Sequence, residues 1–254
     1  MAQNIHKSAL LISSLLLLFL TLPQPSTSES YATRISLLQF MESLSETFPP
    51  HSNWGWNDTS DPCRDWAGVL CDSDGRVVVV GLPKLDLAGT LDFKPLCRIQ
   101  SLRRLDLTDN GISGPIPSEV ANCTSLTHLM LGGNWLQGLL PGSISSLTNL
   151  EWVDVSNNRL VGPIPSGFGT MSNVTAFFAQ NNQISGKIPG EMSFTSLREF
   201  NVSRNQLAGT IPRGFYNFPA SGFVGNPGLC GQPLLIACAP SPSPAAAPAI
   251  SDGW

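Results

Sequence analysis

Apolar positions in the middle of the chain recur in a pattern that fits one short strand per repeat. In Leu102-x-x-Leu105-x-Leu107-x-x-Asn110, leucines spaced by three and two residues lead to an asparagine. The asparagine returns at spacings of 24, 24, 24 and 23 residues, as Asn134, Asn158, Asn182 and Asn205. A Gly-x-[Ile/Leu]-Pro sequence follows it each time and ends in Pro117, Pro141, Pro165, Pro189 and Pro212. A fixed period of this length predicts a repeat solenoid.

A weaker copy precedes these five repeats, with Leu85 in place of the asparagine, so that six repeats span residues 77–212. One strand cannot bury its own apolar face, and we therefore expect the repeats to stack into a continuous core of inward leucines. An inward asparagine just past each strand can bond backbone groups that would otherwise be unpaired in the interior. The expected fold class is an α/β repeat solenoid of short parallel strands with a 3-10 or irregular convex side.

The two ends of such a stack would expose core, and the sequence supplies a distinct unit at each. Upstream, residues 29–76 place apolar side chains at helical spacing, namely Leu37, Phe40, Met41, Leu44 and Phe48. Downstream, residues 213–238 contain Phe215, Phe218 and Phe223. We expect both segments to be caps of the solenoid.

Four of the six cysteines form two local pairs. Seven residues separate Cys63 from Cys71, and seven separate Cys230 from Cys238. In an oxidising compartment this spacing predicts two local disulfides, each worth up to about 3 kcal/mol. Metal binding is disfavoured because the pairs lie at opposite ends of the solenoid with no histidine nearby.

The remaining cysteines, Cys97 and Cys123, belong to adjacent repeats. They stand five and three residues before the equivalent leucines Leu102 and Leu126, and so are out of register. We expect buried thiols here in preference to a third bridge.

The two termini indicate a secreted chain. Residues 1–28 contain an apolar run of about 14 residues, shorter than the roughly 20 of a membrane-spanning helix, which predicts a signal peptide. Residues 239–254 are rich in Pro, Ser and Ala and predict a disordered tail. No second run is long enough to span a membrane, although the tail could also be the outer stalk of a longer receptor. Four N-x-[ST] sequences are then predicted glycosylation sites, at Asn57, Asn122, Asn173 and Asn201.

Composition and charge narrow the choice of partners. Only 13% of the residues are charged and the net charge is −4. The chain therefore lacks the excess of basic residues that is typical of a nucleic-acid-binding protein. His128, Asp154 and Ser156 are the residue types of a nucleophilic triad, but no strained serine elbow or oxyanion hole accompanies them. We therefore expect no enzyme, no cofactor and no metal.

Function is expected on the strand positions that face the concave side. Alternate side chains of a strand point the same way, which places Met130, Trp152 and Phe178 as large apolar groups on successive repeats. Exposed aromatic side chains of this kind often anchor partners, although these rings could instead only pack on one another. The predicted partner-binding set is Arg104, Asp106, His128, Met130, Trp152, Asp154, Phe178 and Gln180. A glycan at Asn201 would lie on the same surface.

Four sequence motifs resemble the ectodomains of plant leucine-rich-repeat receptor-like kinases and receptor-like proteins. They are Trp56…Asp61-Pro62-Cys63-x-x-Trp66-x-Gly68-Val69-x-Cys71, the 24-residue repeats with Gly-x-Ile-Pro, Ala121-Asn122-Cys123-Thr124-Ser125-Leu126, and Gly225-Asn226-Pro227-Gly228-Leu229-Cys230-Gly231. The match covers essentially all of residues 29–254.

The resemblance implies a right-handed leucine-rich-repeat superhelix in the apoplast or at the outer face of the plasma membrane. Such a module recognises a peptide, a steroid or another leucine-rich-repeat protein, often with a receptor-kinase co-receptor. Any kinase domain would lie in sequence beyond this chain. The alternatives are a secreted leucine-rich-repeat inhibitor of a wall-degrading enzyme and a structural wall protein held by its tail.

Overall fold

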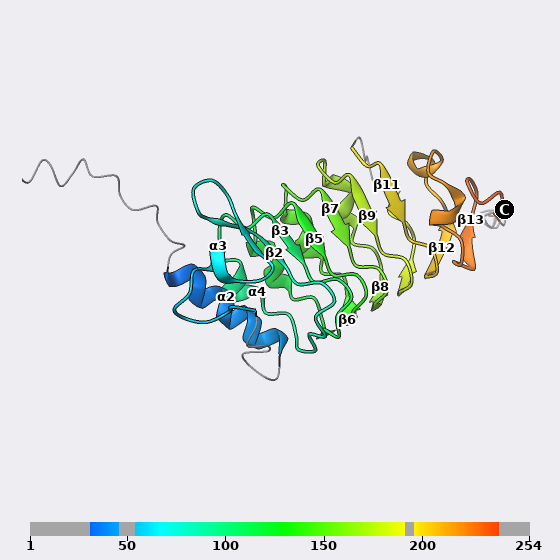
Figure 1. Cartoon of the computed structure of the whole chain (residues 1–254). Helices are drawn as coiled ribbons and strands as arrows, with labels where there is room; N and C mark the ends of the chain where they lie inside the picture. Colours follow the sequence, from blue (N-terminus) through cyan, green and yellow to red (C-terminus); the bar gives the residue numbers. More distant parts are fainter. Residues whose placement is uncertain (1–30, 46–53, 191–195, 239–254) are drawn as a thin grey trace, which may run out of the picture.

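Seven strands of the solenoid form one sheet along its length (Figure 1). The structure is a computed structural model that describes residues 31–45, 54–190 and 196–238. Within these residues the sheet has the order β1 (Val69–Cys71), β2 (Val77–Gly81), β3 (Arg104–Asp106), β5 (His128–Met130), β7 (Trp152–Asp154), β9 (Ala176–Phe178) and β11 (Glu199–Asn201). All neighbours are parallel except β1 and β2. The predicted fold class is confirmed.

A second sheet, which the sequence pattern did not predict, runs beside the first. Among the described residues its order is β13 (Gly228–Cys230), β12 (Gln206–Thr210), β10 (Gln183–Gly186), β8 (Arg159–Gly162), β6 (Trp135–Leu139) and β4 (Ser113–Gly114). The glycine of each Gly-x-[Ile/Leu]-Pro sequence has a positive φ, between 75° and 90°, which only glycine adopts without strain. The residues between the asparagine of each repeat and this glycine therefore form a short strand, which ends at the glycine or one residue after it.

Short 3-10 helices form the convex side, as predicted. They are η1 (Ser118–Asn122), η2 (Gly142–Ser146), η3 (Ser166–Thr170) and η4 (Arg213–Phe215), and each begins directly after the proline that closes a repeat. Proline fits this position because it fixes φ and has no N–H to leave unpaired. The first repeat differs, since its convex segment is an α-helical turn, α4 (Phe93–Leu96).

The prediction of two buried thiols is wrong, because Cys97 and Cys123 form a third disulfide. The two Cα atoms are 4.4 Å apart, within the range of a disulfide. Leu85 and Asn110 are 25 residues apart, one more than in later repeats, and the α-turn takes up the extra residue. Cys97 therefore ends α4 next to η1, which a residue count back from Leu102 did not reveal.

Both predicted caps are present. Helix α2 (Tyr31–Leu44) buries Leu37, Phe40, Met41 and Leu44 against the first repeat, and the rings of Trp56 and Trp66 stack beside α3 (Pro62–Asp65). At the other end, η5 (Ala220–Gly222) continues the hydrogen bonds beyond β11, because the N–H of Val202 donates to Gly222 O. The local disulfides Cys63–Cys71 and Cys230–Cys238 are confirmed. Phe48, the predicted signal peptide and the tail lie outside the described residues.

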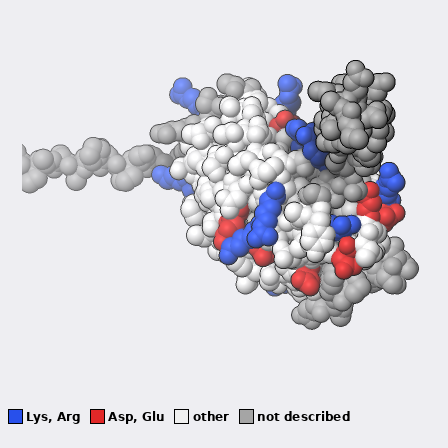
Figure 2. All heavy atoms as spheres, turned by 90° about the vertical axis from the view of Figure 1, so that its left-hand side faces the viewer, with Lys and Arg blue, Asp and Glu red and all other residues white. Residues whose placement is uncertain are grey.

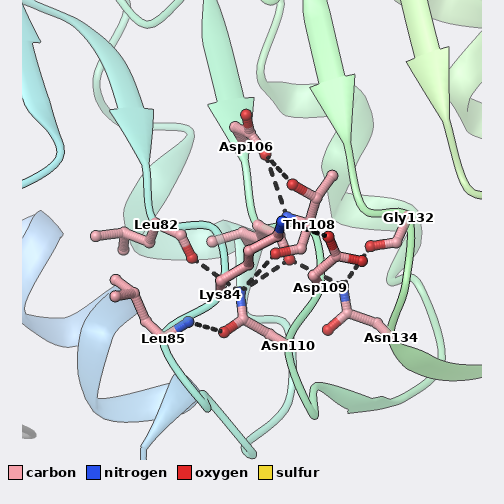
Figure 3. A network of polar contacts seen from close by, with 10 residues as sticks. Leu82, Lys84, Leu85, Asp106, Thr108, Asp109, Asn110, Gly132 and Asn134 are labelled. Carbon is pink, nitrogen blue, oxygen red and sulfur yellow. Dashed lines mark hydrogen bonds and ion pairs between the residues drawn. The ribbon is translucent and has the colours of Figure 1, made fainter.

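Six buried asparagines form a ladder through the interior, which we call the asparagine ladder: Asn110, Asn134, Asn158, Asn182, Asn205 and Asn226. Figure 3 shows its first members, where Asn110 Oδ1 accepts from the N–H of Leu85 and its Nδ2 donates to Leu82 O. Each later asparagine likewise accepts an N–H of the preceding repeat and donates to carbonyl groups. The ladder extends one repeat past the prediction, to Asn226 in the C-terminal cap.

No helix within the described parts of the chain has the length and apolarity needed to cross a membrane. Charges of both signs are scattered over the N-terminal end of the molecule in Figure 2, without a continuous basic area on that face.

Candidate functional site

The register of the seven-stranded sheet aligns seven of the eight predicted partner-binding residues in two rows, and the eighth, Gln180, lies two residues beyond the end of β9. One row runs through Arg104, His128, Trp152, Ala176 and Glu199. The second row, two residues further along each strand, runs through Asp106, Met130, Asp154, Phe178 and Asn201. The residue between the rows, such as Leu129 in β5, is buried. Both rows therefore point to the same side of the sheet, which we call the strand face, but Asp106 and Ala176 are buried there by their neighbours.

Aromatic rings on three adjacent strands contact one another on the strand face. The Trp152 ring lies 6.3 Å from the His128 ring, nearly parallel to it, and 5.2 Å from the Phe178 ring. These distances are typical of favourable ring pairs. Ala176, opposite Trp152, is only 1% exposed. The rings thus pack on one another and still remain half-exposed; with Met130 they form the strand-face patch, defined as His128, Met130, Trp152 and Phe178.

Acidic side chains beside the patch are held by local bonds. Asp106 Oδ2 lies 3.2 Å from an Arg104 guanidinium nitrogen, and its Oδ1 accepts from the Thr108 hydroxyl. Asp154 Oδ1 accepts from the N–H of Ser156, and its carboxylate lies over Gly132, where any larger side chain would collide with it. Asp106 is buried and paired with Arg104, so the partly exposed carboxylate at this border is that of Asp154, which favours a partner that brings hydrogen-bond donors or positive charge.

Two polar atoms among the predicted residues are buried without a partner in the described structure. They are Trp152 Nε1, a donor, and Gln180 Oε1, an acceptor. Leaving such a group unpaired costs about 1–3 kcal/mol. Both side chains would gain if a rearrangement on binding supplied the missing partner.

The surroundings of His128 favour its neutral form. Burial, and next the positive charge of Arg104, lower the pKa of His128 from its ordinary 6.5, while Glu151 opposes them. Its Nδ1 lies 2.9 Å from the Thr127 hydroxyl. Ser156, the serine of the triad considered above, is 3% exposed and its hydroxyl accepts from Asn157. His128 and Ser156 therefore have hydrogen-bond partners other than each other, and the described structure shows no triad.

A hollow of about 220 Å³ lies at the C-terminal end of the patch, and sequence reasoning missed most of it. Its lining combines Phe178 with residues of β11 and of the C-terminal cap, namely Arg198, Glu199, Phe200, Asn201, Phe218, Pro219, Ser221 and Gly222. The sequence predicts Phe215 and Phe218 only as residues of the C-terminal cap. Phe215 is buried, but Phe218 is only partly covered. The sequence signal for this hollow was therefore the presence of more aromatic residues in the cap than its core buries.

A second exposed apolar surface lies on the other sheet. Trp135 and Leu139 of β6 are 57% and 59% exposed, and the Arg159 guanidinium lies over the Trp135 ring. Next to them lies an open groove, which is lined by Pro115, Gln137, Gly138, Arg159, Val161 and Gln183. The sequence pattern did not predict this lateral surface, because its residues lie outside the leucine-spaced strand of each repeat.

The predicted glycosylation sites all fall within the described residues. Asn57, Asn122 and Asn173 are exposed, whereas Asn201 is half-buried on the strand face. Their occupancy stays a prediction. Of the residues that the structure describes, no group of His, Cys, Asp or Glu is arranged to hold a metal ion.

Family models match three parts of the chain. The leucine rich repeat N-terminal domain matches residues 34–72, and leucine rich repeat models match residues 100–160 and 196–218. Receptor-like protein kinase 7 of Arabidopsis thaliana is 43% identical over 74 residues, which is 29% of this chain and 8% of the kinase. Pollen receptor-like kinase 1 of the same plant is 37% identical over 102 residues, 40% of this chain and 14% of the kinase. The chain thus spans a small part of these curated relatives.

Solved structures extend the similarity over most of the chain. Pollen Receptor Kinase 3 superposes with a TM-score of 0.73 at 30% identity, covering 80% of this chain and 99% of that one. The Arabidopsis receptor kinase HAESA, solved with the peptide hormone IDA and the co-receptor SERK1, gives a TM-score of 0.69 at 30% identity and covers 78% of this chain and 34% of that one. The chain therefore belongs to the family of plant leucine-rich-repeat receptor ectodomains.

Proposed function

We propose that this chain is the extracellular recognition part of a plant cell-surface receptor, secreted or held at the outer face of the plasma membrane. It binds a peptide or another leucine-rich-repeat ectodomain, such as that of a co-receptor kinase, through the strand-face patch. The observation that carries the proposal is the stack of His128, Trp152 and Phe178 on adjacent strands, beside a hollow.

The size of the hollow favours a protein or peptide partner. Small-molecule sites usually enclose about 300–1,000 Å³, more than the 220 Å³ beside Phe178. A single bulky side chain of a partner fits this space better than a whole ligand does. Partly exposed aromatic rings next to it are the residue types that dominate binding energy at interfaces.

Relatives of known structure support this class of partner. HAESA was solved with a peptide hormone and a co-receptor, and BIR3 was solved in a complex with SERK2. The quoted relatives are receptors, and none favours an inhibitor of wall-degrading enzymes. We propose no catalytic activity for this chain, so that signalling would depend on a kinase domain elsewhere.

The test is capture of defined partners by the full secreted chain. Purified plant leucine-rich-repeat ectodomains and synthetic secreted peptides would be screened by biolayer interferometry, first with the wild type and then with Trp152→Ala. Trp152→Ala removes an anchor worth about 2 kcal/mol, and we therefore expect it to bind its partner roughly 30-fold more weakly than the wild type does.

Trp135→Ala is the matched control, because it removes the same side chain from the lateral surface. We expect it to bind as the wild type does. If Trp152→Ala kept full affinity while Trp135→Ala lost it, the binding surface would be the lateral groove instead.

A further inference from the structure

Asn201 stands where a modification would change the strand-face patch. Its strand register places it opposite Phe178, and both residues line the hollow. It is followed by Val202 and Ser203, which completes an N-x-[ST] acceptor sequence. The site that the proposed function assigns to a partner therefore contains a residue that secreted chains can carry glycosylated.

The Asn201 amide is free to carry a sugar without disturbing the strand. Its Oδ1 accepts from the N–H of Ser203 at 3.0 Å, which holds the side chain in place. Among the described residues its Nδ2 has no hydrogen-bond partner, and it is not one of the buried unpaired atoms, so it reaches solvent. In Asn57 and Asn173, by contrast, Nδ2 already donates to a carbonyl.

We propose that Asn201 is an N-glycosylation site whose glycan covers the hollow and Phe178, so that glycan occupancy controls access to the C-terminal half of the patch. The inference concerns the surface assigned under the proposed function and rests on it for its biological meaning. His128 and Met130 lie on β5, three strands away from β11, and stay accessible in both forms.

The chemistry of the transfer agrees with this geometry. A lipid diphosphate-linked oligosaccharide supplies the sugar: the bond between Nδ2 and the sugar C1 forms, the C1–O bond to the diphosphate breaks, and one amide proton leaves. Oδ1 takes no part in the new bond, so its hydrogen bond to the Ser203 N–H is retained. The glycan then projects from the strand face rather than into the core.

Two measurements on the full chain, secreted from plant cells, test the proposal without a known ligand. Mass spectrometry of the peptide that contains Asn201 reports occupancy. Hydroxyl-radical footprinting then reports the solvent exposure of single side chains in the folded protein. We expect Asn201 to be occupied, and Phe178 and Phe218 to be oxidised several-fold less in the wild type than in Ser203→Ala.

Ser203→Ala removes the acceptor sequence and keeps the backbone N–H that bonds Asn201. Asn201→Gln is a second variant without an acceptor and should give the same increase. Thr124→Ala is the matched control, because it removes the acceptor at Asn122, the last residue of η1 on the convex side, and should leave the oxidation of Phe178 unchanged. Trp135 is the internal reference in every sample.

An unmodified Asn201, or equal oxidation of Phe178 in the wild type and Ser203→Ala, would overturn the proposal. Neither result would touch the proposed function, which depends on the loss of partner binding in Trp152→Ala. If instead Trp152→Ala kept its partner while Ser203→Ala uncovered Phe178, the glycan site would stand and the recognition surface would have to be sought elsewhere.

Discussion

Replacing asparagines of the ladder with leucine should cost stability in proportion to the backbone groups that lose every partner. Asn158 Oδ1 is the acceptor for the buried N–H of Leu136, and its Nδ2 donates to the carbonyls of Leu131, Val155 and Ser156. Those three carbonyls keep another donor, from Asn134, Asn182 and Gly133. Asn158→Leu therefore leaves one group, the N–H of Leu136, without a hydrogen-bond partner, which should lower the unfolding free energy by about 1–3 kcal/mol.

Asn110→Leu should be more severe, because the repeat before it lacks an asparagine of its own. Its Oδ1 accepts from the N–H of Leu85, and its Nδ2 donates to Leu82 O (Figure 3). The same Oδ1 also accepts from the N–H of Leu87. Three groups are orphaned, although Leu85 is partly exposed and water can reach it. The expected cost is about two to three times that of Asn158→Leu.

The assay is equilibrium urea unfolding of the oxidised chain, in which a shift of midpoint at constant slope reports a change of stability. Because both variants carry the same substitution, the steric part of the change is shared and the difference reflects the orphaned groups. The exposed Asn149→Leu, which loses one bond to Thr124 O, is the control and should stay within about 0.5 kcal/mol of the wild type. Equal losses in Asn110→Leu and Asn158→Leu would refute the reasoning.

Two further predictions concern the convex bridge and the patch. The Cys97–Cys123 bridge closes a sequence separation of 26 residues, so Cys97→Ser with Cys123→Ser should lower the unfolding free energy by about 3.5 kcal/mol; detection of two free thiols in the denatured, unreduced wild type would contradict the bridge. Since burial and Arg104 lower the pKa of His128 below 6.5, the unfolded chain takes up a proton first as the pH falls, and stability drops from pH 6.5 down to the lowered folded pKa. His128→Gln should remove that part of the loss between neutral and mildly acidic pH in urea unfolding, and an unchanged pH dependence would refute the assignment.

The repeat period was enough to predict the first sheet and its outward residues. A strand with Leu105 and Leu129 inward must place Arg104 and His128 outward, and the constant spacing aligns the repeats. The second sheet could not be predicted in the same way, because β6 and β8 carry glycine and polar residues and are held by backbone bonds and by asparagine side chains such as that of Asn158.

The convex bridge and the hollow depend on details that a residue count does not contain. One added residue in the first repeat changes a 3-10 turn to an α-turn and moves Cys97 next to η1. Phe218 reaches the strand face only because η5 folds the cap back beside β11, a contact between segments of different repeats. Occupancy of the glycosylation sites also stays a prediction, since it depends on the cell that secretes the chain.

Photo-crosslinking of a bound partner tests the central claim most directly. A photoreactive amino acid would replace Met130, in the middle of the strand-face patch, or Gln137, in the lateral groove, and a partner captured by the wild type would be irradiated with each variant. Our account predicts a crosslinked product from position 130 and none from position 137. A product from position 137 alone would contradict it and would place recognition on the second sheet.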